Sequence, residues 1–389
     1  MILGALAAFG PLSTDAYLPG LPQLTRDFGA PAWAAQLTLT ASMLGIAFGQ
    51  LIAGPSSDSL GRRRPLLAGL VGYAVASAAC AAAPSVAALI VMRVIQGFAG
   101  GVGIVIARAI VRDRFEGTDA AKMYATLMIV TGVAPICAPL VGGQALRFTS
   151  WRGIFVGLAV IGVVLLVVVA LRLPETVGPD ERRGGGLGDT FRPLAQLLAD
   201  PVFAATALAF SLAFGAMFAN ISGLSFVLED VYGLSPQAFS LVFSLNACGL
   251  VAASQIGGRL VARFGAPALF RAGLTGILLA GAATLTVTLT GAGLAFLLPS
   301  LFLLMSSGGL AMPNGMATAM HGREQVLGSA AALLGLGQFG LGALVAPLVG
   351  VGGAHDALPM AIVIATCGTC AFALERATAR RRALVSAHG

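Results

Sequence analysis

The sequence is poor in charged side chains. Only 10% of its 389 residues are Asp, Glu, Lys or Arg, against about 25% in a typical soluble domain. Hydrophobic types make up 57%, and the mean hydropathy is +0.91. These values exclude a soluble globular enzyme, a disordered chain and a nucleic-acid-binding module. The net charge of +7 is carried by few side chains between long apolar runs, so we interpret it as charge that holds cytoplasmic loops in place.

The chain also lacks the residue patterns of several chemistries. All five cysteines fall within apolar stretches, so no disulfide framework is expected. The three histidines lie near loops or the tail without ligand spacing, so we predict no metal site. No Walker motif is present, which excludes ATP as the energy source. Without a nucleophile–base pair, an enzyme is not expected.

Long apolar runs dominate what is present. About twelve of them approach the roughly 20 residues that a membrane-spanning helix needs, with centres near residues 11, 45, 74, 97, 132, 162, 212, 247, 278, 303, 338 and 366. The first begins at Met1 without a basic region or a cleavage site, so we expect a span and not a signal peptide; whether residues precede it stays open.

The longest polar break is Gly-rich and separates six runs from six. We therefore predict an N-terminal half at 1–176, a flexible cytoplasmic linker at 177–198 and a C-terminal half at 199–389. With both termini in the cytoplasm, nineteen of the 23 Lys and Arg residues lie at cytoplasmic ends of spans. The positive-inside rule favours this orientation. Of the other four, Arg93 lies inside a span, and three lie outside: Arg26, Arg147 and Arg152.

The two halves share a glycine pattern around the loop between their second and third spans. At a shift of 204 residues, Gly54, Gly61 and Gly69 match Gly258, Gly265 and Gly273. Among 52 glycines three matches could be chance, but their position at equivalent loops favours an internal repeat.

Two charged side chains lie inside predicted spans, where each charge is costly and requires a reason. Asp15 lies toward the outer end of the first span, and Arg93 lies at a comparable depth in the fourth. If both face the bundle interior, they can share a polar cavity, and we predict that Asp15 carries a proton. The alternatives are an interfacial Asp15 that caps a helix end and an Arg93 that bonds backbone carbonyls.

Two further segments combine glycine with charge or proline. In Gly54-Pro-Ser-Ser-Asp58-Ser-Leu-Gly61-Arg62-Arg63-Arg64, the glycines permit a tight turn, and Asp58 can cap a helix or pair with a loop arginine. In the fifth span, prolines kink the helix and glycines allow close packing. We therefore predict that this helix can seal one side of a cavity. The alternative is a kink that has no function. The residues of this segment are Gly132, Pro135, Pro139, Gly142 and Gly143.

Other polar side chains within the predicted spans either line a substrate cavity or bond a neighbouring helix. The cavity candidates are Tyr17, Gln36, Asn220, Asn246 and Gln338. Phenylalanine is abundant in the second half, where an aromatic wall would suit a lipophilic substrate.

Several of these segments resemble signatures of the major facilitator superfamily. The G-x-x-x-D-x-x-G-R-R pattern resembles the signature between spans two and three, but Ser59 stands where relatives have Arg or Lys, so one cation is missing or supplied by a neighbour such as Arg64. Arg93-Val-Ile-Gln96-Gly97 resembles the R-x-x-Q-G motif, which is tied to proton coupling. The fifth-span segment resembles the antiporter motif of exporters, with Ala138 in place of its usual glycine.

Other short segments are similar to the bicyclomycin/chloramphenicol-resistance branch of drug:proton antiporters. They are Ser13-Thr14-Asp15-Ala-Tyr17-Leu18-Pro19, Gln36-Leu-Thr-Leu, Arg108-Ala-Ile-Val-Arg112-Asp113 and Trp151-Arg152. The resemblance covers roughly residues 13–176; the second half matches only in span number and the repeat.

The resemblance implies an all-α integral membrane protein with 12 transmembrane helices, in which two six-helix halves surround a central cavity. It implies a monomer in the bacterial cytoplasmic membrane that exports chloramphenicol-like or bicyclomycin-like amphiphilic drugs by alternating access. The proton gradient would drive it without a cofactor. Asp15 would bind the proton, Arg93 and Gln96 would couple it to substrate, and the gate would comprise Gly54, Asp58, Gly61, Arg62 and Arg63. The alternatives are a transporter of an endogenous sugar, amino acid or peptide and, more distantly, a sensor or membrane-embedded enzyme.

Overall fold

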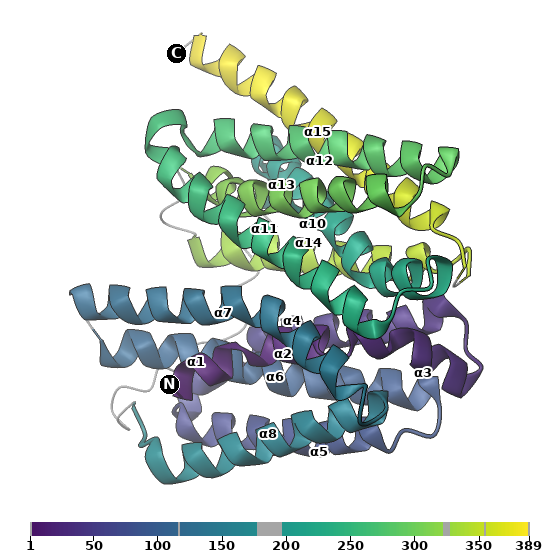
Figure 1. The fold of residues 1–389 in the computed structure, drawn as a ribbon. Helices are drawn as coiled ribbons and strands as arrows, with labels where there is room; N and C mark the ends of the chain where they lie inside the picture. The colour runs from purple at the N-terminus through teal and green to yellow at the C-terminus, as the bar shows by residue number, and fades with distance from the viewer. Residues whose placement is uncertain (1, 116, 177–196, 322–326, 354, 388–389) are drawn as a thin grey trace. The chain divides into compact units, whose positions relative to one another are not determined.

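The computed structural model describes residues 2–115, 117–176, 197–321, 327–353 and 355–387, and every element within them is helical (Figure 1). The chain forms two compact units. The first contains Met1–Gly185 and Leu234–Ser244, and the second contains Gly186–Gly233 and Leu245–Gly389. The expected linker at 177–198 lies outside the described residues except for its last two positions. The division into halves at 1–176 and 199–389 stays a prediction.

The first unit opens with a broken helical segment. The elements are α1 (Ile2–Ala7), α2 (Phe9–Asp15), the 3₁₀ helix η1 (Leu18–Gly20) and α3 (Leu21–Phe28). Pro19 and Pro22 lack backbone N–H donors, which explains why no continuous helix runs past Asp15. The longer helices follow: α4 (Ala32–Leu60), α5 (Arg63–Ala81), α6 (Val86–Arg114), α7 (Gly117–Ala145) and α8 (Trp151–Arg172).

The second unit begins at a capped helix. The Asp200 carboxylate accepts hydrogen bonds of 2.9 and 3.3 Å from the N–H groups of Val202 and Phe203, which satisfies donors at the start of the helix. The elements are α10 (Pro201–Phe226), the π-helical η4 (Val227–Val231), most of α11 (Pro236–Phe264), α12 (Ala266–Thr290), α13 (Leu294–Met320), α14 (Leu327–Val349) and α15 (Leu358–Ala387).

Ten helices of the described residues are long and apolar enough to cross a membrane. Every predicted span centre falls within a helix, and the two outside those ten lie in α2 and α14. The outward side chains are apolar: Val164 is 55% exposed and Leu171 77% exposed. Lipid can cover such a surface, whereas soluble monomers expose only limited apolar patches. The predicted all-α membrane fold is confirmed.

Helices α4 and α6 approach each other at backbone distance. A Cβ on Gly45 or Gly49 of α4 would overlap backbone atoms of α6, and one on Gly97 of α6 would overlap the carbonyl of Ser42. Small residues drive helix association in membranes because they let backbones pack closely. This contact fixes α6, and with it Arg93, against α4.

The glycine repeat has a structural counterpart in each unit. Gly61 ends α4 with φ 86°, and Gly265 follows α11 with φ 77°; both conformations favour glycine. A Cβ on Gly69 would lie 2.9 Å from Val102, and one on Gly273 would lie 2.7 Å from Ala311. Two of the three matched pairs therefore have the same local role.

Candidate functional site

Asp15 lies where the first helical segment breaks. It is the last residue of α2, and its half-buried carboxylate accepts a 3.0 Å hydrogen bond from the hydroxyl of Thr14. Among the described residues, the ion pairs all lie elsewhere. Within the described ranges, the Asp15 carboxylate is therefore not paired with a cation.

Arg93 is fully buried in the first unit. Its Nη1 donates to the Ser13 carbonyl at 2.9 Å and to Gln96 Oε1 at 2.5 Å. Its guanidinium lies over the Tyr17 ring, 4.5 Å from the centroid, a favourable cation–π geometry. Nη2 has no hydrogen-bond partner within the described part of the chain. Arg93 thus bonds the backbone two residues before Asp15, without an ion pair to Asp15 itself.

Four helices contribute to the polar network around Arg93. Gln96 Nε2 donates to Ser77 Oγ at 2.7 Å, and the hydroxyls of Ser13 and Tyr73 lie 2.6 Å apart. The Tyr17 hydroxyl lies 2.8 Å from that of Thr38. The structure therefore brings together Tyr17, Arg93 and Gln96 of the predicted residues. It adds Ser13, which stands in a quoted segment without an assigned role, and Tyr73 and Ser77, which no motif distinguished from other polar residues in spans.

The remaining cavity candidates are distributed over both units. Gln36 is 1% exposed on α4 of the first unit, whereas Asn220, Asn246 and Gln338 belong to the second. Asn220 and Asn246 are buried, and among the described residues neither Asn220 Oδ1 nor Asn246 Nδ2 has a hydrogen-bond partner. Because a buried unpaired polar atom is costly, each of these atoms is a place where a bound water or substrate would be stabilised.

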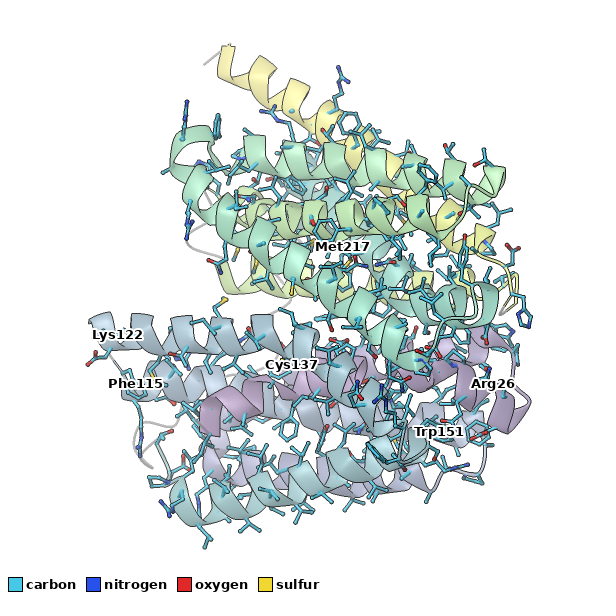
Figure 2. All side chains as sticks on the ribbon, in the orientation of Figure 1. Arg26, Phe115, Lys122, Cys137, Trp151 and Met217 are labelled. Atoms are coloured by element: carbon cyan, nitrogen blue, oxygen red, sulfur yellow. The ribbon has the colours of Figure 1, made fainter. Side chains whose placement is uncertain are left out.

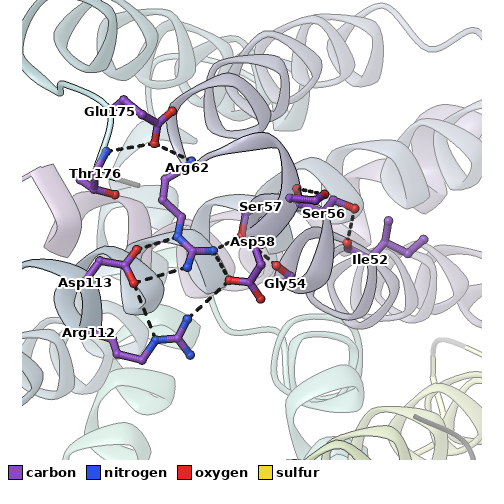
Figure 3. Close-up of polar contacts among 11 residues, drawn as sticks. Ile52, Gly54, Ser56, Ser57, Asp58, Arg62, Arg112, Asp113, Glu175 and Thr176 are labelled. Atoms are coloured by element: carbon purple, nitrogen blue, oxygen red, sulfur yellow. Dashed lines mark hydrogen bonds and ion pairs between the residues drawn. The ribbon is translucent and has the colours of Figure 1, made fainter. Parts of the chain in front are cut away.

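The α4–α5 turn is held by an ion-pair network (Figure 3). Arg62 pairs with Asp58 at 2.6 Å and with Asp113 of α6 at 2.7 Å. Burial lowers the pKa of Arg62, but the hydrogen bonds and charges of Asp113 and Asp58 outweigh this and raise the pKa overall. Arg62 therefore stays charged at the centre of the network.

A second cation beside Asp58 is Arg112, whose Nη2 lies 3.5 Å from Asp58 Oδ1. Arg64, suggested as a neighbour that could supply the missing cation, forms no ion pair with Asp58 in the part of the chain that the structure describes. Arg63, predicted beside Arg62 in the gate, instead donates to the Ala170 carbonyl at 2.8 Å. Gly54 contributes its carbonyl, which accepts from Ser57 at 2.9 Å.

Glu175 anchors the same turn from the end of the first unit. Its carboxylate accepts a 2.8 Å hydrogen bond from the backbone N–H of Arg62 (Figure 3). It accepts another, of 3.2 Å, from the backbone N–H of Arg63. These groups lie at the start of α5, where the partial positive charge of the helix dipole also stabilises an anion. Sequence reasoning missed this role of Glu175 because the partners lie 113 residues apart. The sequence shows only that residue 175 is acidic, not what it binds.

The antiporter-like segment of α7 contacts both the backbone next to Asp15 and the first part of α11. Pro135 and Pro139 lie inside α7, and Gly132 is half-buried. A Cβ on Gly142 would overlap the carbonyl of Ala16, directly after Asp15. Gly143 packs against Ser240, and its carbonyl accepts a 2.8 Å hydrogen bond from Gln237. Both of these α11 residues belong to the first unit.

Comparison with known proteins identifies the family to which this chain belongs. The family "Major Facilitator Superfamily" matches residues 3–347. The chain belongs to this superfamily of membrane transporters and is not an enzyme.

Three relatives show its place within that superfamily. It is 39% identical to the "Uncharacterized MFS-type transporter YdgK" of Bacillus subtilis, over 95% of this chain and 93% of the relative. It is 29% identical to the "Bicyclomycin resistance protein homolog" of Haemophilus influenzae, over 94% and 92%. It is 32% identical to the "Chloramphenicol resistance protein" of Pseudomonas aeruginosa, over 74% and 68%. The predicted superfamily is confirmed, and two resistance proteins are among the relatives, at 29% and 32% identity.

Solved structures agree on the fold. A crystal structure of the peptide transporter POT in complex with sulfate matches with a TM-score of 0.77 at 17% identity, over 97% of this chain and 93% of that one. A bacterial homologue of the lysosomal transporter Spinster matches with 0.74 at 15%, over 97% and 96%. Both confirm the major facilitator architecture.

Proposed function

We propose that this protein is a proton-coupled exporter of small amphiphilic drugs of the chloramphenicol-like or bicyclomycin-like kind. The proposal includes both termini in the cytoplasm and a proton-driven, alternating-access cycle. The observation that carries it is the packing of Gly142 against the backbone of Ala16, because it joins the antiporter-like segment to the residue beside Asp15.

The arrangement around Asp15 supports a proton-carrying role. A carboxylate without a fixed cation changes its protonation state more freely than one locked in an ion pair. Arg93 supplies positive charge through a side chain tied to the Ser13 carbonyl. Protonation of Asp15 changes the charge balance at the helix break while leaving the Arg93 hydrogen bonds intact.

A cycle follows from this geometry. Substrate enters from the cytoplasm while Asp15 is ionised, and protonation from outside weakens substrate binding and releases it. Opposed binding of proton and substrate is what coupling requires. Arg62, Asp58 and Asp113 stabilise the turn between α4 and α5 in one state of the cycle, and the helix break and α7 adjust between states.

Transport of an endogenous metabolite is the second candidate. The relative with the highest identity given above is itself described as uncharacterized, so its name supports neither candidate. The names of the two resistance-protein relatives and the antiporter-like segment favour the drug exporter.

The test is a drug-susceptibility panel in a bacterial host that lacks its own exporters. Wild type is compared with Asp15→Asn at matched membrane expression, and Asp119→Asn serves as the control. Asp119 is 68% exposed and pairs only with Lys122 among the described residues. The expected result is resistance to one or a few compounds with wild type and the control, and its loss with Asp15→Asn.

Other outcomes separate the parts of the proposal. Equal resistance with Asp15→Asn would keep export and refute the role of Asp15. No resistance to any compound, with proton-driven uptake of a sugar, amino acid or peptide into vesicles, would replace the drug exporter with the second candidate.

A further inference from the structure

A pocket of about 430 Å³ lies between α12 and α15 of the second unit. Its polar lining comes from Arg271 and Thr275 on α12 and from Glu375 and Arg376 on α15, and Leu274 and Phe372 add apolar surface. None of these residues belongs to the site proposed above. The transport cycle therefore leaves the pocket without a role.

The pocket lies at the depth of lipid headgroups. Arg271 is five residues from the start of α12, or about 8 Å along a helix that rises 1.5 Å per residue. Arg376 is 18 residues from the start of α15 at Leu358, or about 27 Å, which is close to the roughly 30 Å thickness of the hydrocarbon core. Both guanidinium groups thus lie near the membrane–water boundary, where arginine is favourable.

The outer surface of the same helix pair is apolar. Leu279 and Leu289 of α12 are 58% and 65% exposed, and Ile362 of α15 is 47% exposed. Lipid chains would cover these side chains in the membrane. A polar pocket at the end of such a surface is accessible to a ligand that has both a headgroup and acyl chains.

The charge of the pocket matches one phosphodiester. Arg271 and Arg376 are exposed, and neither forms an ion pair in the described part of the chain. The Glu375 side chain is buried, at 1% exposure, and it is the single acid beside two arginines among the lining residues. An excess of one positive charge suits a singly charged headgroup. Arginine binds phosphate oxygens through its planar set of donors.

We propose that this pocket binds the headgroup of an anionic phospholipid such as phosphatidylglycerol. The phosphate lies between Arg271 and Arg376, and an acyl chain continues along the exposed apolar surface of α12 and α15. Basic pockets between transmembrane helices are known to bind lipid headgroups in general. In the orientation proposed above the lipid belongs to the cytoplasmic leaflet, but the site itself depends neither on that orientation nor on the cargo.

The test uses the purified full-length protein in detergent and native mass spectrometry. Phosphatidylglycerol, phosphatidylethanolamine, phosphatidylcholine and inorganic phosphate are added separately to wild type and to Arg271→Gln/Arg376→Gln. The matched control is Arg259→Gln/Arg263→Gln, which removes two exposed arginines from the end of α11. Arg263 also lies over a phenylalanine ring, as Arg376 does.

The expected result is preferential retention of phosphatidylglycerol by wild type and the control, with at least a fivefold loss in Arg271→Gln/Arg376→Gln. Arg271→Lys/Arg376→Lys should retain part of the binding and guards against a folding defect. Unchanged retention in the glutamine variant, or an equal loss in the control, would overturn the proposal. Equal retention of phosphatidylethanolamine would refute charge recognition, and displacement of lipid by millimolar phosphate would identify a site for small anions instead.

Discussion

Replacing Asp113 by Asn should destabilise the first unit more than replacing Asp58, although Asp58 is the acid of the family-like signature. The Asp113 side chain is 15% exposed and pairs with Arg62, which is 4% exposed. The Asp58 side chain is 42% exposed. Burial decides the ranking, because solvent screens an exposed pair and cannot compensate a buried charge that has lost its partner.

The expected magnitudes follow from these exposures. Loss of a largely buried ion-pair partner costs about 3 to 5 kcal/mol, and Asp113→Asn should fall at the lower end because Arg62 keeps Asp58. Loss of a partly exposed pair costs about 0.5 to 1 kcal/mol. At about 2 to 4 °C per kcal/mol for a unit of this size, Asp113→Asn should lower Tm by about 6 to 12 °C, and Asp58→Asn by about 1 to 4 °C.

Thermal unfolding of the purified protein in one detergent, followed by circular dichroism, measures both shifts. Asp119→Asn is the control, because its pair with Lys122 is exposed on both sides and its Tm should stay within about 2 °C of wild type. A shift for Asp58→Asn equal to or larger than that for Asp113→Asn would refute the ranking by burial.

Two further predictions concern the helix break. Gly142→Val should abolish drug export at normal expression, because its Cβ would overlap the Ala16 carbonyl. The control Gly157→Val, at a glycine with open space around it, should export like wild type. Equal export by both variants would contradict the packing argument. Arg93→Lys should reduce export at least tenfold in a vesicle assay although it keeps the charge. The reason is that lysine lacks the guanidinium plane that stacks on Tyr17 and bonds the Ser13 carbonyl. Full export by Arg93→Lys would show that charge alone suffices.

The helices could be predicted from the sequence because the membrane imposes their length. A span needs about 20 apolar residues regardless of its neighbours, so every predicted centre falls within a helix. The first segment shows the limit of this argument. Its composition predicts one span, but the prolines after Asp15 divide it into short elements, and the division places Asp15 at a helix end.

The site could be predicted only in part. Asp15 and Arg93 were visible because a charge in an apolar run is rare, and the α4–α5 turn was visible from its glycines and arginines. The pairing of Asp113 and Glu175 with the α4–α5 turn was not predicted, although Asp113 stands in one of the quoted segments, because their partners are distant in the chain and no local spacing rule connects them. Nothing in the sequence singled out Glu375, because its 1% exposure follows from the packing of α15 against its neighbours, which sequence periodicity alone does not specify.

The position of Glu175 also constrains chain length. α8 ends at Arg172, and Glu175 bonds the backbone of Arg62 and Arg63 only three residues later. Residues 173–175 therefore form a connection of fixed length between the end of α8 and the start of α5. One residue inserted there would pull the carboxylate away from both N–H groups. In this stretch an insertion is more damaging than most single substitutions, so homologues should vary in residue type here well before they vary in length.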